Sequence, residues 1–495
     1  MQISLNSAAV AEAPVDLVVL GVFAGKVNKS ADFKVLDRAL DGALSRAVKE
    51  EGFTGGEGST MTVNTLGALR AKRVMIAGVG AESDAGRGLF ELAGRSVRVG
   101  NRVGAKSVLL ALPKTSMELS VAMQLVGRGT ALGEYKFDKF LSDKGRKRSV
   151  TKVLVDLGEN GNVSAALRTA LKRGETVATG VAVARDLVNL PAADLYPESY
   201  AKRALAEGKK HGFTVKVHDK AALKRMKMGM LMAVGQGSDR PPCLVHMTYT
   251  PKGASAKTKS IALVGKGVTF DSGGYSLKPS AAMLDMKIDM GGAASVLGTM
   301  IAIAKLKPKV KVHGIATLAE NLVSGNAYKL GDVLKAASGR TVEINNTDAE
   351  GRLCLGDALH YANEQDPDEI IDLATLTGAV VVALGPYTVG LYSTDDKMAN
   401  KLLTSSERMG ESFWHMPLNN RLKEQLKSDI ADCKNTGKRE GGSITAALFL
   451  SEFVKVSKWA HLDIAGPVSS DQETGATTKG GTGVAVATLV DYVTG

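Results

Sequence analysis

The chain has 495 residues, of which 44% are hydrophobic and 23% are charged, the balance of an ordinary globular protein. A single hydrophobic core rarely extends over so many residues, so the length predicts two or three domains. The three cysteines, Cys243, Cys354 and Cys433, are far apart and include no CxxC pair. This argues against a disulfide framework or a cysteine-built zinc site and favours a reducing, cytoplasmic setting.

The chain is basic, with 63 Lys and Arg against 51 Asp and Glu, a net charge of +12. Residues 1–168 hold 24 of these basic residues and 17 of the acidic ones, and they include a local cluster at Lys144, Arg146, Lys147 and Arg148. Such an excess can attract nucleic acid, although a basic surface that keeps a protein in solution is the more common explanation.

Neither apolar run of the sequence predicts a membrane segment. Val15–Phe23 has no basic stretch before it and follows Glu12, so it predicts a buried strand rather than a signal peptide. Ile370–Leu384 is interrupted by Asp372 and two threonines and is too short to span a bilayer. We therefore expect no membrane association.

The first 160 residues alternate between strand-like and helix-like patterns. Amphipathic segments predict helices over Phe33–Glu50 and Gly88–Val99, between four hydrophobic runs that predict strands. The predicted strands are Asp16–Phe23, Arg73–Val79, Ser107–Leu112 and Lys152–Leu157. This alternation predicts an α/β domain whose sheet is mixed or parallel. Gly78-Val79-Gly80 lacks the third glycine of a dinucleotide loop and predicts a turn.

Residues 162–190 predict one long helix, which Pro191 ends and which would link two α/β parts. Beyond it the alternation resumes, and apolar residues at helical spacing predict a helix over Met290–Leu306. The strands predicted here are Thr214–Val217, Cys243–Tyr249, Ser260–Val264, Lys311–Leu318, Glu369–Leu373 and His461–Asp463.

Three short segments of this second part concentrate charged side chains in predicted loops at strand ends. They are a glycine-rich loop after residue 264 with Lys266, Asp271 and Lys278, a turn with Asp289, and a strand end with Asp348, Glu350 and Arg352. Alternate residues of an extended segment point the same way, so Asp348 and Glu350 can serve one site. Arg352, two residues further on, would point the same way.

Four carboxylates in one cleft need positive charge to cancel their repulsion. Two divalent cations would provide it, and an oxygen-rich set suits Mg, Mn, Co or Zn. A two-metal centre can acidify a water molecule and polarise a carbonyl group. Each carboxylate alone is more often a solvated surface group, and Asp289 could simply cap the next helix. The spacing of the whole set favours the metal site.

Five segments carry motifs that occur together, in this order and at this spacing, in one family. They are Val264–Gly274 with Ser276–Pro279 (VGKGVTFDSGG and SLKP), Met286–Ala294 (MKIDMGGAA), Asn346–Leu353 (NTDAEGRL), Leu373–Ala379 (LATLTGA) and Trp459–Pro467 (WAHLDIAGP). In these segments the chain resembles the leucine aminopeptidase family of metallopeptidases. The resemblance covers essentially the whole chain and is strongest from about residue 180 onward.

The resemblance implies an α/β fold of two domains. We expect a macro-like N-terminal α/β domain over residues 1–165, a linker helix over 166–190 and a larger mixed-sheet metallopeptidase domain over 191–495. It also implies a homohexamer that acts on peptides in the cytoplasm.

The resemblance further implies a role for each site residue. The tighter metal would be bound by Lys266, Asp271, Asp289 and Glu350, and the more exchangeable one by Asp271, Asp348 and Glu350. As a ligand Lys266 must be neutral, and adjacent dications can lower an amine pKa enough for that. Lys278 would stabilise the oxyanion, and Arg352 would hold a bicarbonate ion that acts as the general base. The side-chain pocket would be lined by Met286, Thr375, Leu376 and Gly378.

The activity implied is hydrolysis of the N-terminal peptide bond, with preference for leucine-like residues and two divalent metal ions, Mn or Zn, per subunit. A hydroxide that bridges the metals would attack the bond. The alternative is an additional DNA-binding role in recombination or transcription regulation through the basic N-terminal domain, driven by backbone charge. A catalytically dead member is a third reading, and the complete set of site residues argues against it.

Overall fold

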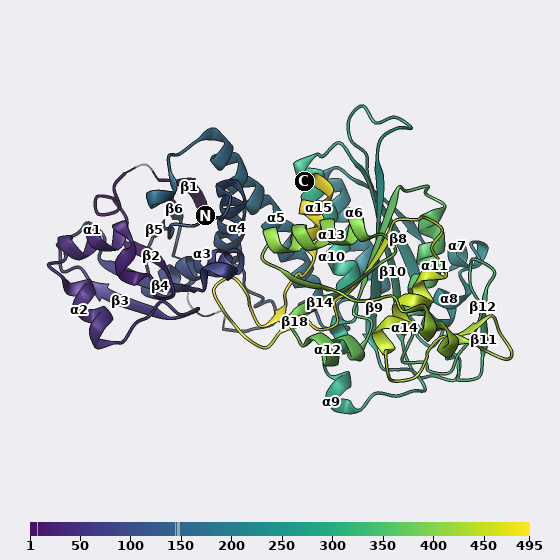
Figure 1. Cartoon of the computed structure of the whole chain (residues 1–495). Helices are drawn as coiled ribbons and strands as arrows, with labels where there is room; N and C mark the ends of the chain where they lie inside the picture. The colour runs from purple at the N-terminus through teal and green to yellow at the C-terminus, as the bar shows by residue number, and fades with distance from the viewer. Residues whose placement is uncertain (7, 144, 146–148) are drawn as a thin grey trace. The chain divides into compact units, whose positions relative to one another are not determined.

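The protein is described by a computed structural model that covers residues 1–6, 8–143, 145 and 149–495 (Figure 1). The chain packs into two units. Unit 1 is Met1–Ala178 with Arg408–Gly410 and Asp471–Lys479, and unit 2 is the remainder. Helix α5 (Ala165–Asn189) contains the point at which unit 1 gives way to unit 2. The expected boundaries 1–165, 166–190 and 191–495 stay a proposal. The basic cluster Lys144, Arg146, Lys147 and Arg148 lies outside the described residues.

Unit 1 is built on a six-stranded sheet. In spatial order the strands are β1 (Gln2–Leu5), β6 (Lys152–Asp156), β5 (Ser107–Ala111), β2 (Leu17–Phe23), β4 (Arg73–Gly80) and β3 (Thr60–Asn64). All neighbours are parallel except β3, which is antiparallel to β4. The four predicted strands are confirmed, whereas the edge strands β1 and β3 have few apolar residues and were not predicted.

Helices cover both faces of this sheet. They bury β2 along its whole length, and the alternate side chains of β2 enter two different cores. Leu17 and Val19 lie in the core with α3 (Ala85–Val103) and α4 (Leu119–Leu132). Val18 and Leu20 lie in the core with α1 (Ala31–Ala39) and α2 (Ala43–Glu50).

The single helix predicted over Phe33–Glu50 is wrong, since α1 and α2 are separate. The chain breaks at Asp41 and Gly42, which have φ of +48° and +74°. The apolar spacing continues across the break because Leu36 and Leu44, on either side of it, enter the same core. Periodicity alone therefore could not reveal the interruption.

A distant segment, Asp471–Lys479, is part of unit 1 and packs on α3. The buried carboxylate of Glu91 accepts hydrogen bonds from Thr474 Oγ1 (2.6 Å), the Ala476 amide (2.8 Å) and Thr477 Oγ1 (2.8 Å). The last residues of unit 1 therefore come from a part of the sequence that follows most of unit 2.

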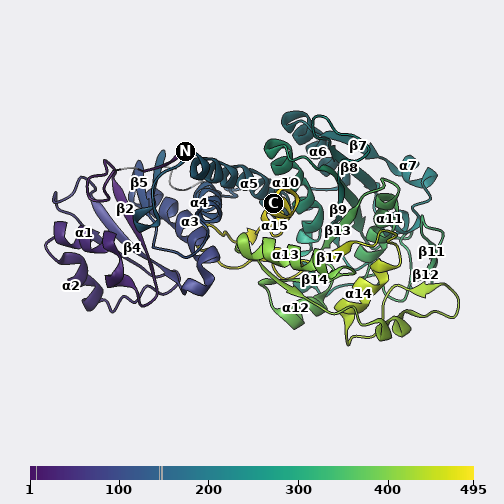
Figure 2. The ribbon, with the colours of Figure 1, turned by 45° about the horizontal axis from the view of Figure 1, so that its top comes forward.

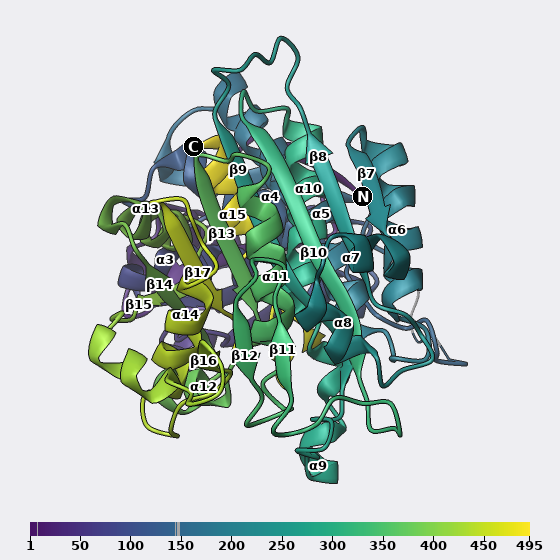
Figure 3. The ribbon, with the colours of Figure 1, turned by 90° about the vertical axis from the view of Figure 1, so that its right-hand side faces the viewer.

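Unit 2 is built on an eight-stranded mixed sheet, seen in Figure 3. In spatial order the strands are β15 (Ser412–His415), β14 (Thr388–Ser393), β17 (Trp459–Asp463), β13 (Glu369–Ala374), β9 (Ser260–Asp271), β10 (Lys311–Asn321), β8 (Cys243–Tyr249) and β7 (Thr214–His218). The central strands β17, β13, β9 and β10 are parallel. The α/β fold class, with a second part that is larger and built on a mixed sheet, is confirmed.

Helices lie on both faces of this sheet, with α10 (Gly291–Leu306) and α11 (Gly351–Asn363) on opposite sides (Figures 1 and 2). Helix α10 is buried almost all round, as its uniformly apolar sequence requires. The other helices are α6 (Pro197–His211), α7 (Lys220–Arg225), α8 (Gly229–Gly235), α9 (Ser280–Met283), α12 (Gly378–Leu384), α13 (Asp396–Arg408), α14 (Gly442–Ser451) and α15 (Val486–Thr494). Two small sheets complete the unit: β11 (Val333–Lys335) with β12 (Thr341–Glu343) and β16 (Cys433–Lys434), and β18 (Ser469–Ser470) with β19 (Gly480–Gly481).

Strand β9 continues seven residues past its predicted end, so Lys266 and Asp271 lie in a strand rather than in a loop. Gly265 and Gly267 suggested a break, but their missing side chains let neighbouring elements approach. A Cβ at Gly265 would lie 2.6 Å from the Gly292 carbonyl of α10, and one at Gly267 would lie 2.7 Å from Leu318 of β10.

Candidate metal centre

The charged side chains predicted for the site converge beyond the carboxyl ends of the central strands of unit 2. From β9 the chain runs through α10 to β10 on one side, whereas from β13 it continues toward β17 on the other. The chain connections thus diverge between β9 and β13, the place where open α/β sheets bind ligands.

Lys266 and Asp271 of β9 both face this site because of a β-bulge. Residues five apart on a regular strand point to opposite faces. Val268 pairs with Ala319 and Phe270 with Glu320, so Thr269 is an extra residue that shifts the alternation by one. The bulge brings Asp271 to the face occupied by Lys266.

Three carboxylates form the centre of the site. One ligand oxygen from each of Asp271, Asp348 and Glu350 lies within 4.8 Å of the others. Asp348 lies in a turn, and Glu350 is the N-cap of α11 with helical backbone angles. The extended segment predicted here is therefore wrong, and Arg352 lies in the first turn of α11. The carboxylates converge because the chain turns into a helix.

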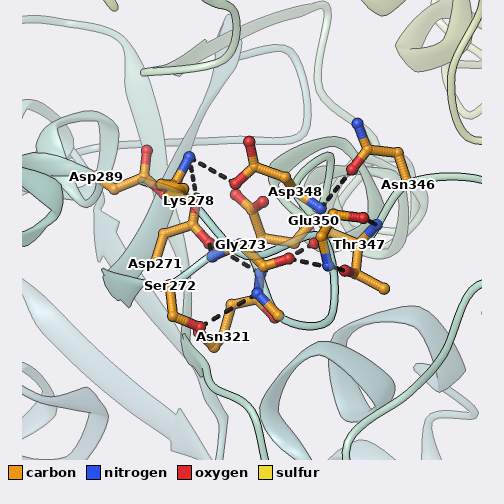
Figure 4. Close-up of polar contacts among 12 residues, drawn as sticks. Asp271, Ser272, Gly273, Lys278, Asp289, Asn321, Asn346, Thr347, Asp348 and Glu350 are labelled. Carbon is orange, nitrogen blue, oxygen red and sulfur yellow. Dashed lines mark hydrogen bonds and ion pairs between the residues drawn. The ribbon is translucent and has the colours of Figure 1, made fainter. Parts of the chain in front are cut away.

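Two lysines neutralise the carboxylates. Lys278 Nζ lies 3.0 Å from Asp271 Oδ2 and 2.6 Å from Asp348 Oδ1, as Figure 4 shows. Lys266 Nζ lies 2.8 Å from both Asp289 Oδ1 and Glu350 Oε1. The two ammonium groups thus stand among the carboxylates where divalent cations would supply the positive charge.

The burial of these groups shifts their ionisation. Burial is the largest influence on Asp271 and, with the nearby charge of Glu350, raises its pKa to about 7. Burial is also the largest influence on Glu350 and acts to raise its pKa, but the charge and hydrogen bond of Lys266 and the charge of Lys278 together keep that pKa below its ordinary value. Burial lowers the pKa of Lys266, yet the charges of Asp289, Glu350 and Asp271 together raise it above the ordinary value.

The residues fit a pair of divalent cations. Asp289 Oδ2 and Glu350 Oε2 are buried and have no hydrogen-bond partner among the described residues. Unpaired buried carboxylate oxygens are strongly destabilising unless a cation or donor meets them. Carboxylate oxygens and an amine are also the ligand types that Mn and Zn accept.

Arg352 is buried near Glu350 and Asp463, two charges that act to raise its pKa. Its Nη1 donates to the Asn435 carbonyl at 2.8 Å, whereas its Nε has no partner in the described part of the chain. Burial dominates and lowers its pKa to about 10, so the guanidinium remains a cation near neutral pH. A small anion would satisfy the free donor.

Models of known families match most of the chain. Residues 182–490 match the catalytic domain of the cytosol aminopeptidase family, and residues 19–144 match its N-terminal domain. The chain belongs to the cytosol aminopeptidase family. As a member it is a metal-binding aminopeptidase, a metallo-exopeptidase that removes N-terminal residues from peptides.

Full-length relatives agree with the cytosol aminopeptidase assignment. Probable cytosol aminopeptidases of Alkaliphilus oremlandii (strain OhILAs) and Synechococcus sp. (strain CC9605) are 40% and 43% identical, over 100% of this chain and 99% of theirs. A mutant of tomato leucine aminopeptidase superposes with a TM-score of 0.91 at 34% identity, over 100% of this chain and 96% of its own. The bottromycin maturation enzyme BotP in complex with Mn has a TM-score of 0.84 at 36% identity, over 97% of this chain and 98% of its own.

The residues predicted to form the substrate pocket of this cytosol aminopeptidase come from two segments. Met286 lies in a 3-10 turn ahead of α10 and is half-buried. Leu376 is half-buried, and Gly378 is exposed, with open space where a Cβ would stand. Thr375 is buried, and its Oγ1 donates to Asp289 Oδ1 at 2.7 Å, so the structure ties it to the carboxylates.

Three further residues that support the centre were not predicted from the sequence. Asn321 Nδ2 donates to Asp271 Oδ1 at 2.8 Å, and Thr347 Oγ1 donates to the Gly273 carbonyl at 2.7 Å (Figure 4). Asp463 accepts hydrogen bonds from the Leu376 amide (3.1 Å) and Thr377 Oγ1 (2.7 Å). Asp463 lies inside a family motif, which is the one signal that could have drawn attention to it.

Among the described residues, no helix is both long enough and apolar enough to cross a membrane.

Proposed function

We propose that this metallo-aminopeptidase binds two divalent cations, Mn or Zn, and a bicarbonate ion, and that it prefers peptides with leucine-like N-terminal residues. One observation carries the proposal: four carboxylates meet around two lysine ammonium groups, and two buried carboxylate oxygens have no hydrogen-bond partner. The Mn complex of the related BotP supports Mn as one of the candidate metals.

Lys266, Asp271, Asp289 and Glu350 hold the tighter cation in this proposal. Asp271 and Glu350 are shared with the second cation, to which Asp348 adds its carboxylate and its backbone carbonyl. When bound, the pair supplies a Lewis-acid centre that acidifies water and polarises the scissile carbonyl. With cations bound, Asp289 and Glu350 would no longer need the charge of Lys266, so the pKa of Lys266 would fall and its neutral amine could serve as a ligand.

Lys278 acts on the substrate. Burial lowers its pKa, but the charge of Asp271 and the hydrogen bond with Asp348 raise it above the ordinary value, so Lys278 stays protonated. With cations bound at Asp271 and Asp348, the Lys278 ammonium would be free to donate to the substrate carbonyl oxygen. A fixed donor of this kind stabilises the negative charge that develops there in the transition state.

Arg352 positions the base. Its unpartnered Nε and its positive charge suit bicarbonate, which would accept a proton from the attacking water. When bound, bicarbonate would supply the transfer of that proton to the leaving amine. Met286, Thr375, Leu376 and Gly378 surround the side chain of the substrate's first residue, and the half-buried Met286 and Leu376 favour an aliphatic one.

The proposal is tested with a leucyl anilide and its N-acetylated form, each with and without a chelator and with Mn or Zn added back. We expect cleavage of the free-amine substrate alone, loss with the chelator and recovery with metal. Glu350→Gln should lower kcat/KM by at least about 1000-fold, because it removes a shared ligand. Glu364→Gln, at the opposite end of α11, is the control and should leave the rate unchanged.

Three results would contradict parts of this proposal. Equal cleavage of the acetylated substrate would refute recognition of the free amine. Activity that survives the chelator would refute the metal centre. Alanyl substrates cleaved faster than leucyl ones would refute the leucine-like preference while leaving the metal centre intact.

A second candidate function, in addition to peptide hydrolysis, is DNA binding in recombination or transcription regulation. The observation that favours it is the excess of basic residues in positions 1–168. Binding should weaken steeply with salt and should be lost when Lys144, Arg146, Lys147 and Arg148 are neutralised. No binding to duplex DNA at low salt would refute it.

The family resemblance also leads us to propose a homohexamer in the cytoplasm. Sedimentation of the purified chain tests the assembly, and a monomer at micromolar concentration would contradict it.

A further inference from the structure

Asn435, which directly follows β16, is fully buried and extends the pairing of β16 with β12. In that pairing Lys434 lies beside Glu343, the last residue of β12. The Asn435 amide then donates to the Glu343 carbonyl at 3.0 Å. Beyond Glu343 the chain leaves the strand and leads to Asp348, so any further contact between these two segments must use side chains.

The side chain of Asn435 takes over where the backbone pairing ends. Its Oδ1 accepts hydrogen bonds from the amides of Asn345 (3.0 Å) and Asn346 (3.4 Å), and its Nδ2 donates to the Asn346 carbonyl at 2.6 Å. A carboxamide offers both an acceptor and donors, so it can pair with a backbone amide and a carbonyl at once. No other residue in the described part of the chain bonds the Asn346 carbonyl. The orientation of Asn346 therefore depends on Asn435.

Asn346 transmits this constraint to Asp348. The Asn346 Oδ1 accepts a hydrogen bond of 2.8 Å from the Asp348 amide, as Figure 4 shows. A bond from an asparagine side chain to the backbone two residues later stabilises a turn. This turn sets the direction of the Asp348 carboxylate and carbonyl, both of which are assigned above to the more exchangeable cation.

Asn435 contacts only one side of the metal centre. Besides the bonds to Asn345 and Asn346, its carbonyl accepts from Arg352 Nη1 at 2.8 Å. Among the described residues, none of its hydrogen bonds involves Lys266 or Asp289, the two ligands that serve the tighter cation alone. Its influence should therefore differ between the two cations.

We propose that Asn435 is a positioning residue for the more exchangeable cation and that it acts through Asn346 on Asp348. The inference rests on the proposed pair of cations and adds a structural route to one of them. Loss of the Asn435 side chain leaves Lys266 and Asp289 in place, so the affinities for the two cations should separate. A side chain that only stabilised the fold would alter both affinities or neither.

Isothermal titration of the metal-depleted full-length enzyme with Mn measures the two affinities. Asn435→Ala should weaken the weaker site at least about tenfold, the usual effect of losing a partner of a metal ligand, and should change the tighter site by less than about twofold. kcat/KM should fall at limiting Mn and recover at saturating Mn. Equal changes at both sites, or no change at either, would overturn the inference. Unaltered enzyme that binds fewer than two Mn would refute the pair of cations itself.

A second variant tests the route through Asn346 and serves if Asn435→Ala does not fold. Asn346→Ala, at a half-buried position, removes the acceptor of the Asp348 amide and should weaken the same Mn site. Because both substitutions act along one route, the double variant should lose no more than about twofold beyond the larger single loss. Fully additive losses, or a loss at the tighter site in Asn346→Ala, would overturn the route.

Two controls separate this role from general stability. The Asn363 side chain also joins two segments, since its Nδ2 donates to the carbonyls of Leu359 (2.8 Å) and Phe453 (2.9 Å). Asn363→Ala should leave both Mn affinities unchanged. Thr375→Val removes a donor to Asp289 and should weaken the tighter site instead. If Asn363→Ala weakens the same site as Asn435→Ala, the effect is one of stability and the positioning role is wrong.

Discussion

A single missing side chain makes room for Lys266 at the metal centre. A Cβ on Gly351 would lie 2.6 Å from Lys266 Cε and 2.7 Å from its Nζ. Lys266 is buried, and the same Nζ also donates a 2.9 Å hydrogen bond to the Thr375 carbonyl. The lysine therefore cannot move aside without leaving Asp289 and Glu350.

Gly351→Ala should lower kcat/KM by about 100-fold or more and weaken Mn binding, because overpacking in a buried site costs roughly 1–3 kcal/mol. Gly325→Ala is the matched control, since a Cβ there meets open space. Mn titration followed by activity gives both quantities. A variant as active as the control would show that Lys266 has another position available.

Thr375 holds Asp289, one of the proposed metal ligands, and does not only line the proposed pocket. Its hydroxyl donates to Asp289 and its carbonyl accepts from Lys266, while Asp463 holds the next two residues of the same segment. Thr375→Val keeps the shape and removes the donor. We expect roughly 10–100-fold weaker Mn affinity, the usual effect of losing a partner of a metal ligand.

Thr299→Val is the matched control for Thr375→Val, because Thr299 is also buried and donates to a backbone carbonyl within α10. The two variants should lose similar thermal stability, but only Thr375→Val should shift the Mn titration. If saturating Mn fails to restore kcat, Thr375 acts on the substrate and the positioning role is wrong.

Helices and strands could be predicted where the local sequence alone determines their bounds. β8 has the bounds Cys243–Tyr249 that its hydrophobic run predicts, and α10 starts within one residue of the predicted position. The break between α1 and α2 and the length of β9 depend on packing partners that no local pattern records. The turn at Asp348 likewise depends on packing partners that no local pattern records.

The site residues also divide into those that the local sequence reveals and those that depend on contacts with distant parts of the chain. Its charged residues stand out because several carboxylates and lysines recur at strand ends within family motifs. Asn321 ends β10 as an ordinary polar residue, and only its pairing with Asp271 across the sheet gives it a role. Contacts between strands far apart in the sequence are therefore what sequence reasoning missed.

Three neighbouring strands and α11 enclose a cluster of histidines. His246 Nε2 lies 2.8 Å from His313 Nδ1, and His246 Nδ1 lies 2.9 Å from Tyr361 Oη, which in turn is 3.2 Å from His218 Nε2. Burial is the main cause that lowers the pKa of His246 to about 3 and that of His313 to about 4. Lys216 and Lys311 nearby lower it further for His246, and Lys311 does so for His313.

These neutral histidines should make the protein sensitive to acid. Unfolded histidine binds a proton below about pH 6.5, whereas the folded cluster does not, so stability is complete above that pH and falls as pH drops toward 4. The loss should be on the order of 3 kcal/mol by pH 4 for each of His246 and His313. Urea unfolding at pH 7, 5 and 4 measures it. His246→Asn should show a shallower loss, and equal losses for both proteins would contradict this account.

The two units share one topological feature, a divergence of chain connections beside parallel strands. In unit 2 the divergence between β9 and β13 lies at the candidate metal centre, and in unit 1 the divergence between β2 and β5 lies at a cavity of about 390 Å³. Unit 1 also depends on residues from beyond unit 2, through the hydrogen bonds that Glu91 accepts.

Glu91→Ala should destabilise unit 1 by about 2–4 kcal/mol, because it leaves a buried amide and two hydroxyls without their acceptor. Amide hydrogen exchange is the measurement, and protection should fall first in 471–479 and in α3. Glu50→Ala, at the exposed end of α2, should change neither. Unaltered protection of 471–479 in Glu91→Ala would show that this segment is held by other contacts.

The contribution of Asp471–Lys479 to unit 1 has a consequence for biosynthesis. Domains usually fold in the order in which the ribosome makes them, so an N-terminal domain is finished early. Here the first unit to emerge must wait for some of the last residues to be translated before Glu91 finds its partners. A nascent chain that stops short of residue 471 would leave both units unfinished, and a protease that surveys truncated products could recognise it at either end.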